Sequence, residues 1–199
     1  EELGPRACRE IFKRVDANPE ANTTFKVEAS MLEIYSEKVR DLFNPQNGDG
    51  KGLKVRDHPK KGPYVQGLTK IAVSTYDEIS RAMDAGTKAR TVAATAMNAT
   101  SSRAHTIFQV IVTQTIVDQA AGNATDKVSV ISLIDLAGSE RADRTGASGD
   151  RLKEGCAINQ SLSALGNVIS ALADQATGAK KKVIVPYRGS VLTHLLKSS

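Results

Sequence analysis

The sequence predicts an α/β fold in one domain, or in part of one, and three patterns support this prediction. Residues 128–134 form an almost unbroken apolar run, which is typical of a β-strand buried on both faces. Apolar residues between Ile158 and Leu172 recur at spacings of three and four, as in an amphipathic helix. Residues 25–31 alternate, which favours another strand. A chain of 199 residues can form one sizeable core, and we find no linker that divides it.

The first quarter of the chain is expected to contain a helix, a strand and a turn-rich segment. Apolar spacing predicts a short helix that starts at Gly4–Pro5 and ends before Asn18–Pro19. After the strand at 25–31, the apolar residues of 34–43 return toward helical spacing. Glycines and polar residues at 44–52 predict a surface turn, because the segment lacks the Gly-Lys-Ser/Thr ending of a phosphate-binding loop.

The second quarter is expected to begin with a short strand at 53–56. The segment 58–65 then predicts an exposed basic loop that two prolines stiffen. Thr75 and Glu78 have the spacing of a capping box, so a helix carrying Ile79 should follow.

The second half of the chain should contain a strand pair and two helices. Residues 107–112 and 128–136 are expected to pair through a turn at 120–126. The stripe from Ile158 to Leu172 predicts the clearest helix, and Pro186 precedes an expected helix whose apolar residues run from 191 to 196.

Charge and cysteine content limit the classes of partner and site. The net charge is +5, and residues 150–199 hold seven basic against three acidic side chains, so we expect an acidic partner surface. Cys8 and Cys156 are far apart and have no metal-ligand spacing, which favours reduced thiols over a zinc site. No apolar run is long enough to cross a membrane and no signal peptide is evident, so we expect a soluble intracellular protein without membrane insertion.

Two polar segments flank the predicted strand pair and carry phosphate-sensing chemistry. In residues 135–140, Asp135 follows a strand and can organise Mg²⁺ and its waters, while the Gly138 amide can approach a terminal phosphate because glycine lacks a Cβ. Asp-x-x-Gly is also common in plain strand-to-loop turns. In residues 98–105, hydroxyls can reach magnesium and phosphate oxygens, and an arginine there can pair with a glutamate of the other segment.

Together these segments resemble the kinesin motor domain. Asn98 to His105 is similar to the family's switch I, and Asp135 to Glu140 is identical to its switch II, Asp-Leu-Ala-Gly-Ser-Glu. The sequences of Leu32–Tyr35, Leu162–Leu172 and Pro186–Arg188 are also similar to the family, so the resemblance extends over essentially the whole chain. The lysines at 180–182 and other segments look most like the third kinesin class. The resemblance implies a kinesin-type P-loop NTPase fold, with a mixed β-sheet and helices on both faces.

The resemblance also implies roles for the residues of both switches. It implies that Ser102 contacts magnesium and the γ-phosphate, and that Ser101 helps to place the attacking water. It implies that Asp135 holds a magnesium-bound water, that Gly138 reports the γ-phosphate, and that Arg103 and Glu140 form a closing salt bridge. Asn98 completes the residues implied to bind ATP and Mg²⁺.

The implied partner is the microtubule, and the implied location is the cytoplasmic cytoskeleton. The helix at about 157–173 is implied to be the relay helix, which moves in response to the two switches and contacts tubulin. The residues implied to face the acidic filament are all basic: Lys60, Lys61, Arg151, Lys153, Lys180, Lys181, Lys182 and Arg188. DNA and RNA are not expected partners, because aromatic residues are few and are not interleaved with lysines.

The sequence departs from the family pattern at several positions. The motif Gly-x-x-x-x-Gly-Lys-Ser/Thr of the P-loop does not occur, and the family's last strand and helix are not matched. Because P-loop amides and lysine supply most of the phosphate cradle, we expect this polypeptide alone not to turn over ATP. Gly189 replaces an aspartate, which is expected to weaken the cap of the last helix by a few tenths of a kcal/mol.

Two other functions remain open from the sequence. A non-motor microtubule-binding protein that has lost nucleotide hydrolysis would keep the basic surface without the catalytic engine. A GTPase is less well supported, because Asp-x-x-Gly is present but no Asn-Lys-x-Asp for guanine recognition accompanies it.

Overall fold

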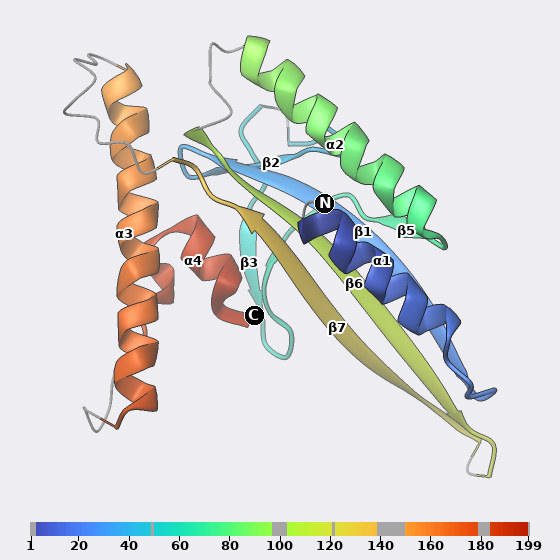
Figure 1. The fold of residues 1–199 in the computed structure, drawn as a ribbon. Helices are drawn as coiled ribbons and strands as arrows, with labels where there is room; N and C mark the ends of the chain where they lie inside the picture. The colour runs from blue at the N-terminus through green and yellow to red at the C-terminus, as the bar shows by residue number, and fades with distance from the viewer. Residues whose placement is uncertain are drawn as a thin grey trace.

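The computed structural model describes residues 3–48, 50–96, 103–120, 122–138, 150–178 and 184–198. Helices cover both faces of one main sheet, as predicted (Figure 1). The elements in chain order are α1 (Leu3–Asp16), β1 (Thr23–Tyr35), β2 (Lys38–Asp41), β3 (Val55–His58), β4 (Gly62–Val65), β5 (Ile71–Val73), α2 (Tyr76–Ala96), β6 (His105–Asp118), β7 (Asn123–Asp135), α3 (Asp150–Ala176), η3 (Tyr187–Gly189), α4 (Val191–Leu195) and η4 (Leu196–Ser198).

The main sheet has the strand order β2-β1-β6-β7, and β5 pairs with β1. Strands β3 and β4 form a separate two-stranded hairpin. Among the described residues every pairing is antiparallel, whereas the predicted sheet was mixed. The predicted pairing of residues 107–112 with 128–136 is confirmed, because β6 and β7 form one long hairpin from Thr106↔Asp135 to Asp118↔Asn123. Its turn is shorter than the expected 120–126, since β7 already begins at Asn123.

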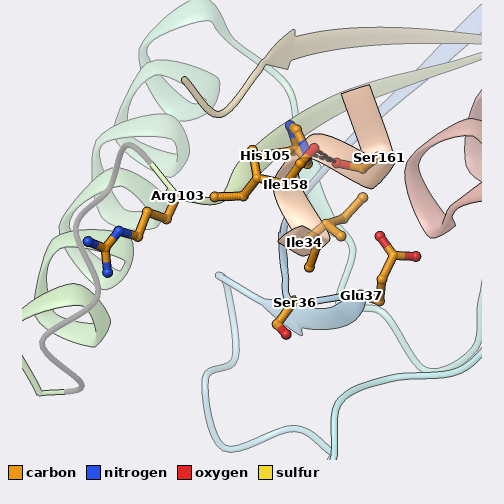
Figure 2. A pocket seen from close by; sticks show the side chains of 8 residues that line it. Ile34, Ser36, Glu37, Arg103, His105, Ile158 and Ser161 are labelled. Carbon is orange, nitrogen blue, oxygen red and sulfur yellow. Dashed lines mark hydrogen bonds between the residues drawn. The ribbon is translucent and has the colours of Figure 1, made fainter. Parts of the chain in front are cut away.

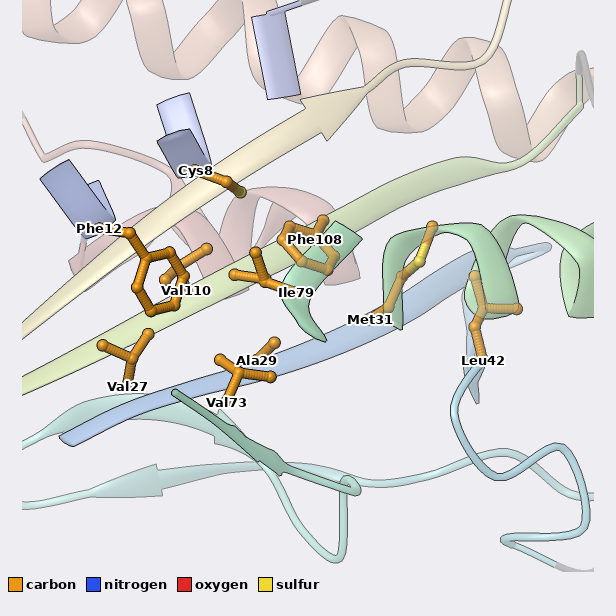
Figure 3. Close-up of a cluster of buried hydrophobic side chains, with 10 residues drawn as sticks. All are labelled: Cys8, Phe12, Val27, Ala29, Met31, Leu42, Val73, Ile79, Phe108 and Val110. Carbon is orange, nitrogen blue, oxygen red and sulfur yellow. The ribbon is translucent and has the colours of Figure 1, made fainter. Parts of the chain in front are cut away.

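One face of the sheet packs against α1 and α2. Alternate residues of β1, namely Val27, Ala29 and Met31, point to this face and meet Phe12 of α1 and Ile79 of α2 (Figure 3). All five side chains are buried, so this layer forms the first hydrophobic core. The prediction of an amphipathic helix near residues 4–17 is confirmed by α1.

The opposite face packs against α4, α3 and the β3–β4 hairpin. Leu32 and Ile34 of β1 point to this side, because successive strand residues alternate between faces. They form a second core with Val39, Ile107 and Leu192, all of which are buried. Leu165 of α3 is partly buried and packs against this cluster. The second core therefore ties α3 and α4 to the sheet.

The expected helical spacing at residues 34–43 is wrong, because this segment forms a β-hairpin. Strand β1 continues to Tyr35, and Tyr35 pairs with Lys38 of β2 across a two-residue turn. Ser36 and Glu37 both adopt positive φ, 49° and 60°, as a tight hairpin turn requires. Ser-Glu is not among the usual sequences for such a turn, so local pattern gave no hairpin signal.

The segment 58–65 is also paired, and the prediction of an exposed loop is wrong for its ends. Val55–His58 and Gly62–Val65 form an antiparallel hairpin in which His58 pairs with Gly62. The short strand expected at 53–56 therefore lies two residues later. Proline is tolerated here because Pro63 lies in one strand of an isolated two-stranded ribbon, where only one side of each strand is paired.

Strand β7 is not buried on both faces, contrary to the prediction from its apolar run. Val128 and Val130 are 56% and 55% exposed. Within the described part of the chain β7 is the edge strand of the sheet, and these two valines lie on the side of α3 and α4 beyond the reach of the second core. An apolar run predicts burial only where another element covers it.

The buried face of α3 differs from the predicted stripe. Ile158 is buried as expected, but Ile169 and Leu172 are 58% and 41% exposed. The residues that do face the interior are mostly small: Ile158, Ser161, Ala164, Val168 and Ala171. Small side chains allow close approach, and a Cβ on Gly189 would lie 3.1 Å from the Cβ of Ala164.

The helix caps follow the predictions in part. The Glu78 amide donates to Thr75 Oγ1 (3.2 Å), but the Glu78 carboxylate accepts from the Ser74 amide (2.7 Å), one residue earlier than a capping box requires. The expected weak cap at Gly189 is wrong, because α4 is capped by Ser190. Ser190 and Thr193 form a complete capping box there.

Within the described ranges, no helix combines the length and apolar character that crossing a bilayer requires.

Candidate functional site

The described parts of the two motif-bearing segments, residues 103–105 and 135–138, meet at one end of the main sheet. β6 begins at His105 and β7 ends at Asp135, and the register places Thr106 opposite Asp135. Because the two strands are antiparallel, the segment that precedes β6 and the segment that follows β7 leave the sheet side by side. Arg103 lies two residues before β6, and Asp135 is the last residue of β7, at the carboxyl end of that strand.

Asp135 presents an exposed carboxylate at this end of the sheet. Its side chain is 68% exposed, and Oδ2 accepts from Nη1 of Arg90 at 3.0 Å. The same guanidinium nitrogen donates to Oγ1 of Thr106 at 3.0 Å, so α2 is tied to both strands at the site. A solvent-accessible carboxylate with a neighbouring cation can hold a water of a hydrated metal ion while its own charge stays balanced.

His105 forms the buried part of the site. Nδ1 of its imidazole accepts from the backbone amide of Ala137 at 3.0 Å, and Nε2 lies 2.7 Å from Oγ of Ser161 in α3 (Figure 2). The hydroxyl of Ser161 donates to the carbonyl of Ile158 at 2.7 Å. Burial holds the pKa of His105 below its usual value, and the charge of Asp135 acts in the opposite direction. The neutral imidazole is thus favoured.

A small crevice lies beside these groups. Its volume is about 10 Å³, enough for one water molecule at most, and it is lined by Glu37, Arg103, His105 and Ser161 among others. Figure 2 shows that the guanidinium of Arg103 points away from His105 and Ser161. Glu140 lies outside the described residues, so the expected Arg103–Glu140 salt bridge stays a prediction.

The remaining predicted switch residues are only partly placed. Gly138 follows Ala137 and lies at the site, whereas Asn98, Ser101 and Ser102 fall outside the described residues. In the described part of the chain, no group of three His, Cys, Asp or Glu side chains could hold a metal ion on its own. The donor set that is described, one exposed carboxylate, fits a metal held through water and by phosphate oxygens, not a metal enclosed by protein ligands.

The predicted basic surface is placed at two points. Lys60 and Lys61 lie in the turn of the β3–β4 hairpin, where their amides donate to Nδ1 of His58 at 3.1 Å each. Arg188 lies in η3 and pairs with Asp57 of the same hairpin at 3.1 Å. Arg151 and Lys153 lie in the first turns of α3, but their side chains are outside the description, as are Lys180, Lys181 and Lys182 entirely.

The hairpin and the C-terminal helices are joined through Asp57. Its second carboxylate oxygen lies 2.9 Å from Nε2 of His194 in α4. Hydrogen bonding to His194 is the largest cause that lowers the pKa of Asp57, and Arg188 adds to it. The elements that carry Lys60, Lys61 and Arg188 therefore form one connected surface beside α3 (Figure 1).

Sequence reasoning missed four residues of this site: Arg90, Thr106, His105 and Ser161. Arg90 and Ser161 lie 45 and 56 positions from the side chains that they contact, so no local pattern connects them. Ser161 carried one available signal, because it lies three residues after Ile158 and four before Leu165, where the helical stripe would place an apolar residue. It is buried although it is polar, and such a residue needs a partner.

Comparison with known proteins identifies the family. The family model of the kinesin motor domain matches residues 2–199. Kinesin-related protein 1 of Dictyostelium discoideum is 56% identical over 98% of this chain, and the human kinesin-like proteins KIF13A and KIF1C are each 55% identical over 100% and 98% of it. The chain spans 9%, 11% and 18% of the length of these three relatives.

Solved structures agree with this assignment. A fast kinesin aligns with a TM-score of 0.83 and 44% identity over 100% of this chain and 52% of its own. KIF14 with ADP in complex with a microtubule aligns with a TM-score of 0.86 and 43% identity, over 99% of this chain and 55% of its own. The switch-like segments, the sheet end where they meet and these similarities lead to one conclusion: this chain belongs to the kinesin motor domain family.

Proposed function

We propose that this chain is the part of an ATP-driven microtubule motor that senses the nucleotide and contacts the filament. The observation that carries the proposal is the meeting of residues 103–105 and 135–138 at one end of the sheet, where hydrogen bonds through His105 reach α3. A phosphate sensor needs two segments that can respond to the same group, and an output helix attached to them. Here the two segments are residues 103–105 and 135–138, and the output helix is α3.

In this proposal the nucleotide is ATP with Mg²⁺, which neutralises and polarises the phosphates when bound. Asp135 would hold a water of the metal, and the Gly138 amide would approach the γ-phosphate. Ser101, Ser102 and Asn98 would contribute the hydroxyl and amide contacts of the other segment. Arg103 and Glu140 would pair when the two segments close.

The filament-facing surface is the connected set of hairpin, η3 and α4. Lys60, Lys61 and Arg188 supply its described positive charge, and Arg151, Lys153 and Lys180 to Lys182 would extend it along α3. Two of the similar solved structures are KIF14 in complex with a microtubule, which supports the microtubule as the partner. A location on the cytoplasmic microtubule cytoskeleton follows from that partner.

The catalytic part of the proposal is tested in a chimeric motor. These 199 residues replace the matching residues of the human KIF1C motor. KIF1C then supplies the parts of a motor that this chain does not cover, which are about half of the similar solved motor chain. We expect ATP hydrolysis that microtubules accelerate, and we expect Asp135→Asn to abolish most of the acceleration. Asp84→Asn, which removes an exposed carboxylate of α2, is the matched control and should behave like the unmodified chimera. An inactive unmodified chimera would contradict the proposal.

The filament part is tested with the 199-residue chain by co-sedimentation with microtubules. Lys60→Glu should weaken binding and reduce its salt sensitivity, because exposed charges act through screened electrostatics. Lys127→Glu, which makes the same charge change on exposed β7, is the control. If the chain binds filaments and the chimera hydrolyses no ATP, the non-motor alternative is favoured. If Lys60→Glu and Lys127→Glu act alike, the proposed surface is wrong.

A further inference from the structure

The imidazole of His105 contacts two segments that are far apart in the chain. Its Nδ1 accepts from the Ala137 amide, between Asp135 and Gly138, at 3.0 Å. Its Nε2 lies 2.7 Å from Oγ of Ser161 in α3, 56 positions away. All three residues are buried. The ring therefore spans the interior between the loop after β7 and α3.

The hydrogen-bond directions in this network determine the tautomer. A backbone amide can only donate, so Nδ1 must be the unprotonated nitrogen of the ring. The proton of the neutral ring is then on Nε2, which donates to Ser161. Ser161 in turn donates its hydroxyl proton to the Ile158 carbonyl at 2.7 Å. Every polar atom of the ring and of the hydroxyl has a partner, and no buried side-chain nitrogen or oxygen in the described part of the chain lacks one.

A protonated ring would break this arrangement. A second N–H at Nδ1 would face the Ala137 amide, and two donors cannot share that contact. The charged groups near the ring are Asp135 at the end of β7, Glu37 in the β1–β2 turn and Arg103 just before β6. Neither carboxylate makes a hydrogen bond with the ring that could accept a proton from Nδ1, and the guanidinium of Arg103 can only donate.

We propose that His105 is a positioning residue that transmits displacement of the loop after Asp135 to α3, through the directed series Ala137 N–H, imidazole and Ser161 hydroxyl. This inference rests on the proposed function, in which that loop follows the nucleotide and α3 contacts the filament. The ring is rigid and both its bonds are buried, so a shift at one end must either move the other end or leave a buried polar group without a partner.

Two conservative variants separate the two ends of the link. In His105→Asn the side-chain oxygen can take the place of Nδ1 and keep the Ala137 bond, but the side chain is too short to reach Ser161. In His105→Gln the amide nitrogen can take the place of Nε2 and keep the Ser161 bond, but the Ala137 amide loses its acceptor. If the ring acted only by filling space, the two variants would have the same effect.

The first measurement is amide hydrogen exchange of Ala137 in the 199-residue chain. We expect exchange about tenfold faster in His105→Gln, the factor expected when a buried donor loses its only acceptor. In His105→Asn, which keeps that acceptor but loses its bond to Ser161, we expect exchange only severalfold faster. Ser161→Ala should also accelerate Ala137 exchange severalfold although Ser161 does not touch Ala137. Ser163→Ala, which removes an exposed hydroxyl of the same helix, should have no effect. Equal exchange in the Asn and Gln variants, or no effect of Ser161→Ala, would overturn the proposal.

The second measurement is made in the chimeric motor, where the readout is the ratio of microtubule-stimulated to basal ATP hydrolysis. We expect Ser161→Ala to lower this ratio severalfold and Ser163→Ala to preserve it. If the unmodified chimera is stimulated by microtubules and Ser161→Ala leaves the ratio unchanged, only the His105 link is wrong. If the unmodified chimera is not stimulated at all, the proposed function is wrong and the inference falls with it.

Discussion

Asp41 offers the sharpest test of how the hairpin that carries Lys60 and Lys61 is held. Its side chain is buried at the end of β2. Oδ1 accepts from the amides of Phe43 and Asn44 at 3.0 and 3.1 Å. Oδ2 accepts from Nδ2 of Asn47 at 2.9 Å and from the Thr69 amide at 2.8 Å. One carboxylate therefore joins the turn after β2 to the chain that leaves β4.

Asp41→Asn preserves the size of the side chain and removes half of its acceptors. The remaining oxygen can still accept from Phe43 and Asn44, but the new NH2 group would face two other donors, on Asn47 and Thr69. A buried donor without an acceptor costs about 1 to 3 kcal/mol. Asn47 is only partly buried and also donates to the Gly67 carbonyl at 2.7 Å, so its cost lies at the low end. We expect a total loss of about 3 kcal/mol in the free energy of unfolding, from a typical 5 to 15 kcal/mol.

The assay is urea unfolding of the 199-residue chain, followed by far-UV circular dichroism. Asp84→Asn is the control, because it makes the same chemical change on the exposed side of α2 and should shift stability by less than about 0.5 kcal/mol. Hydrogen exchange should also increase at Thr69 and at the base of the β3–β4 hairpin. A loss below about 1 kcal/mol for Asp41→Asn would refute the argument that these four bonds depend on a carboxylate.

Three further predictions concern the site and its surroundings. Arg90→Ala should lower the melting temperature by an amount equivalent to about 1 to 2 kcal/mol, because Asp135 loses its ion pair and buried Thr106 loses a donor; an unchanged melting temperature would contradict this. The free energy of unfolding should fall as pH drops below about 6.5, because the unfolded imidazole of His105 takes up a proton before the buried one does, and His105→Asn should remove that part of a pH titration. Gly52→Ala should cost about 1 to 2 kcal/mol in urea unfolding, because φ is +82° and the new Cβ would lie 3.1 Å from a backbone carbonyl oxygen; a neutral result would show that this turn can relax.

Periodic patterns predicted elements well where one face of the element is covered by its neighbours. The apolar spacing of residues 8–15 and the alternation of residues 25–31 correspond to α1 and β1, which pack on each other in the first core. The same reasoning failed at Val128 and at Ile169, where the pattern is apolar and the side chain is exposed. Apolarity is a property of the residue, whereas burial depends on which element lies opposite it.

Local sequence also gave no warning where the backbone takes an uncommon conformation. Ser36 and Glu37 form a tight hairpin turn with positive φ, although neither is a residue that usually adopts it. The turn persists because Ile34 and Val39 on either side of it are buried in the second core, and the register of β1 and β2 follows from their burial. Tertiary packing outweighed the local preference.

The sequence by itself determined the family and the order of the two switch-like segments, because motifs such as Asp135 to Glu140 are contiguous in the chain. Only the tertiary structure decided that Arg90 binds Asp135 and that His105 joins Ala137 to Ser161. Those contacts cross 32 to 56 positions of the chain. Hydrogen-bond partners at such separations depend on how strands pair and helices pack, and no local pattern contains that information.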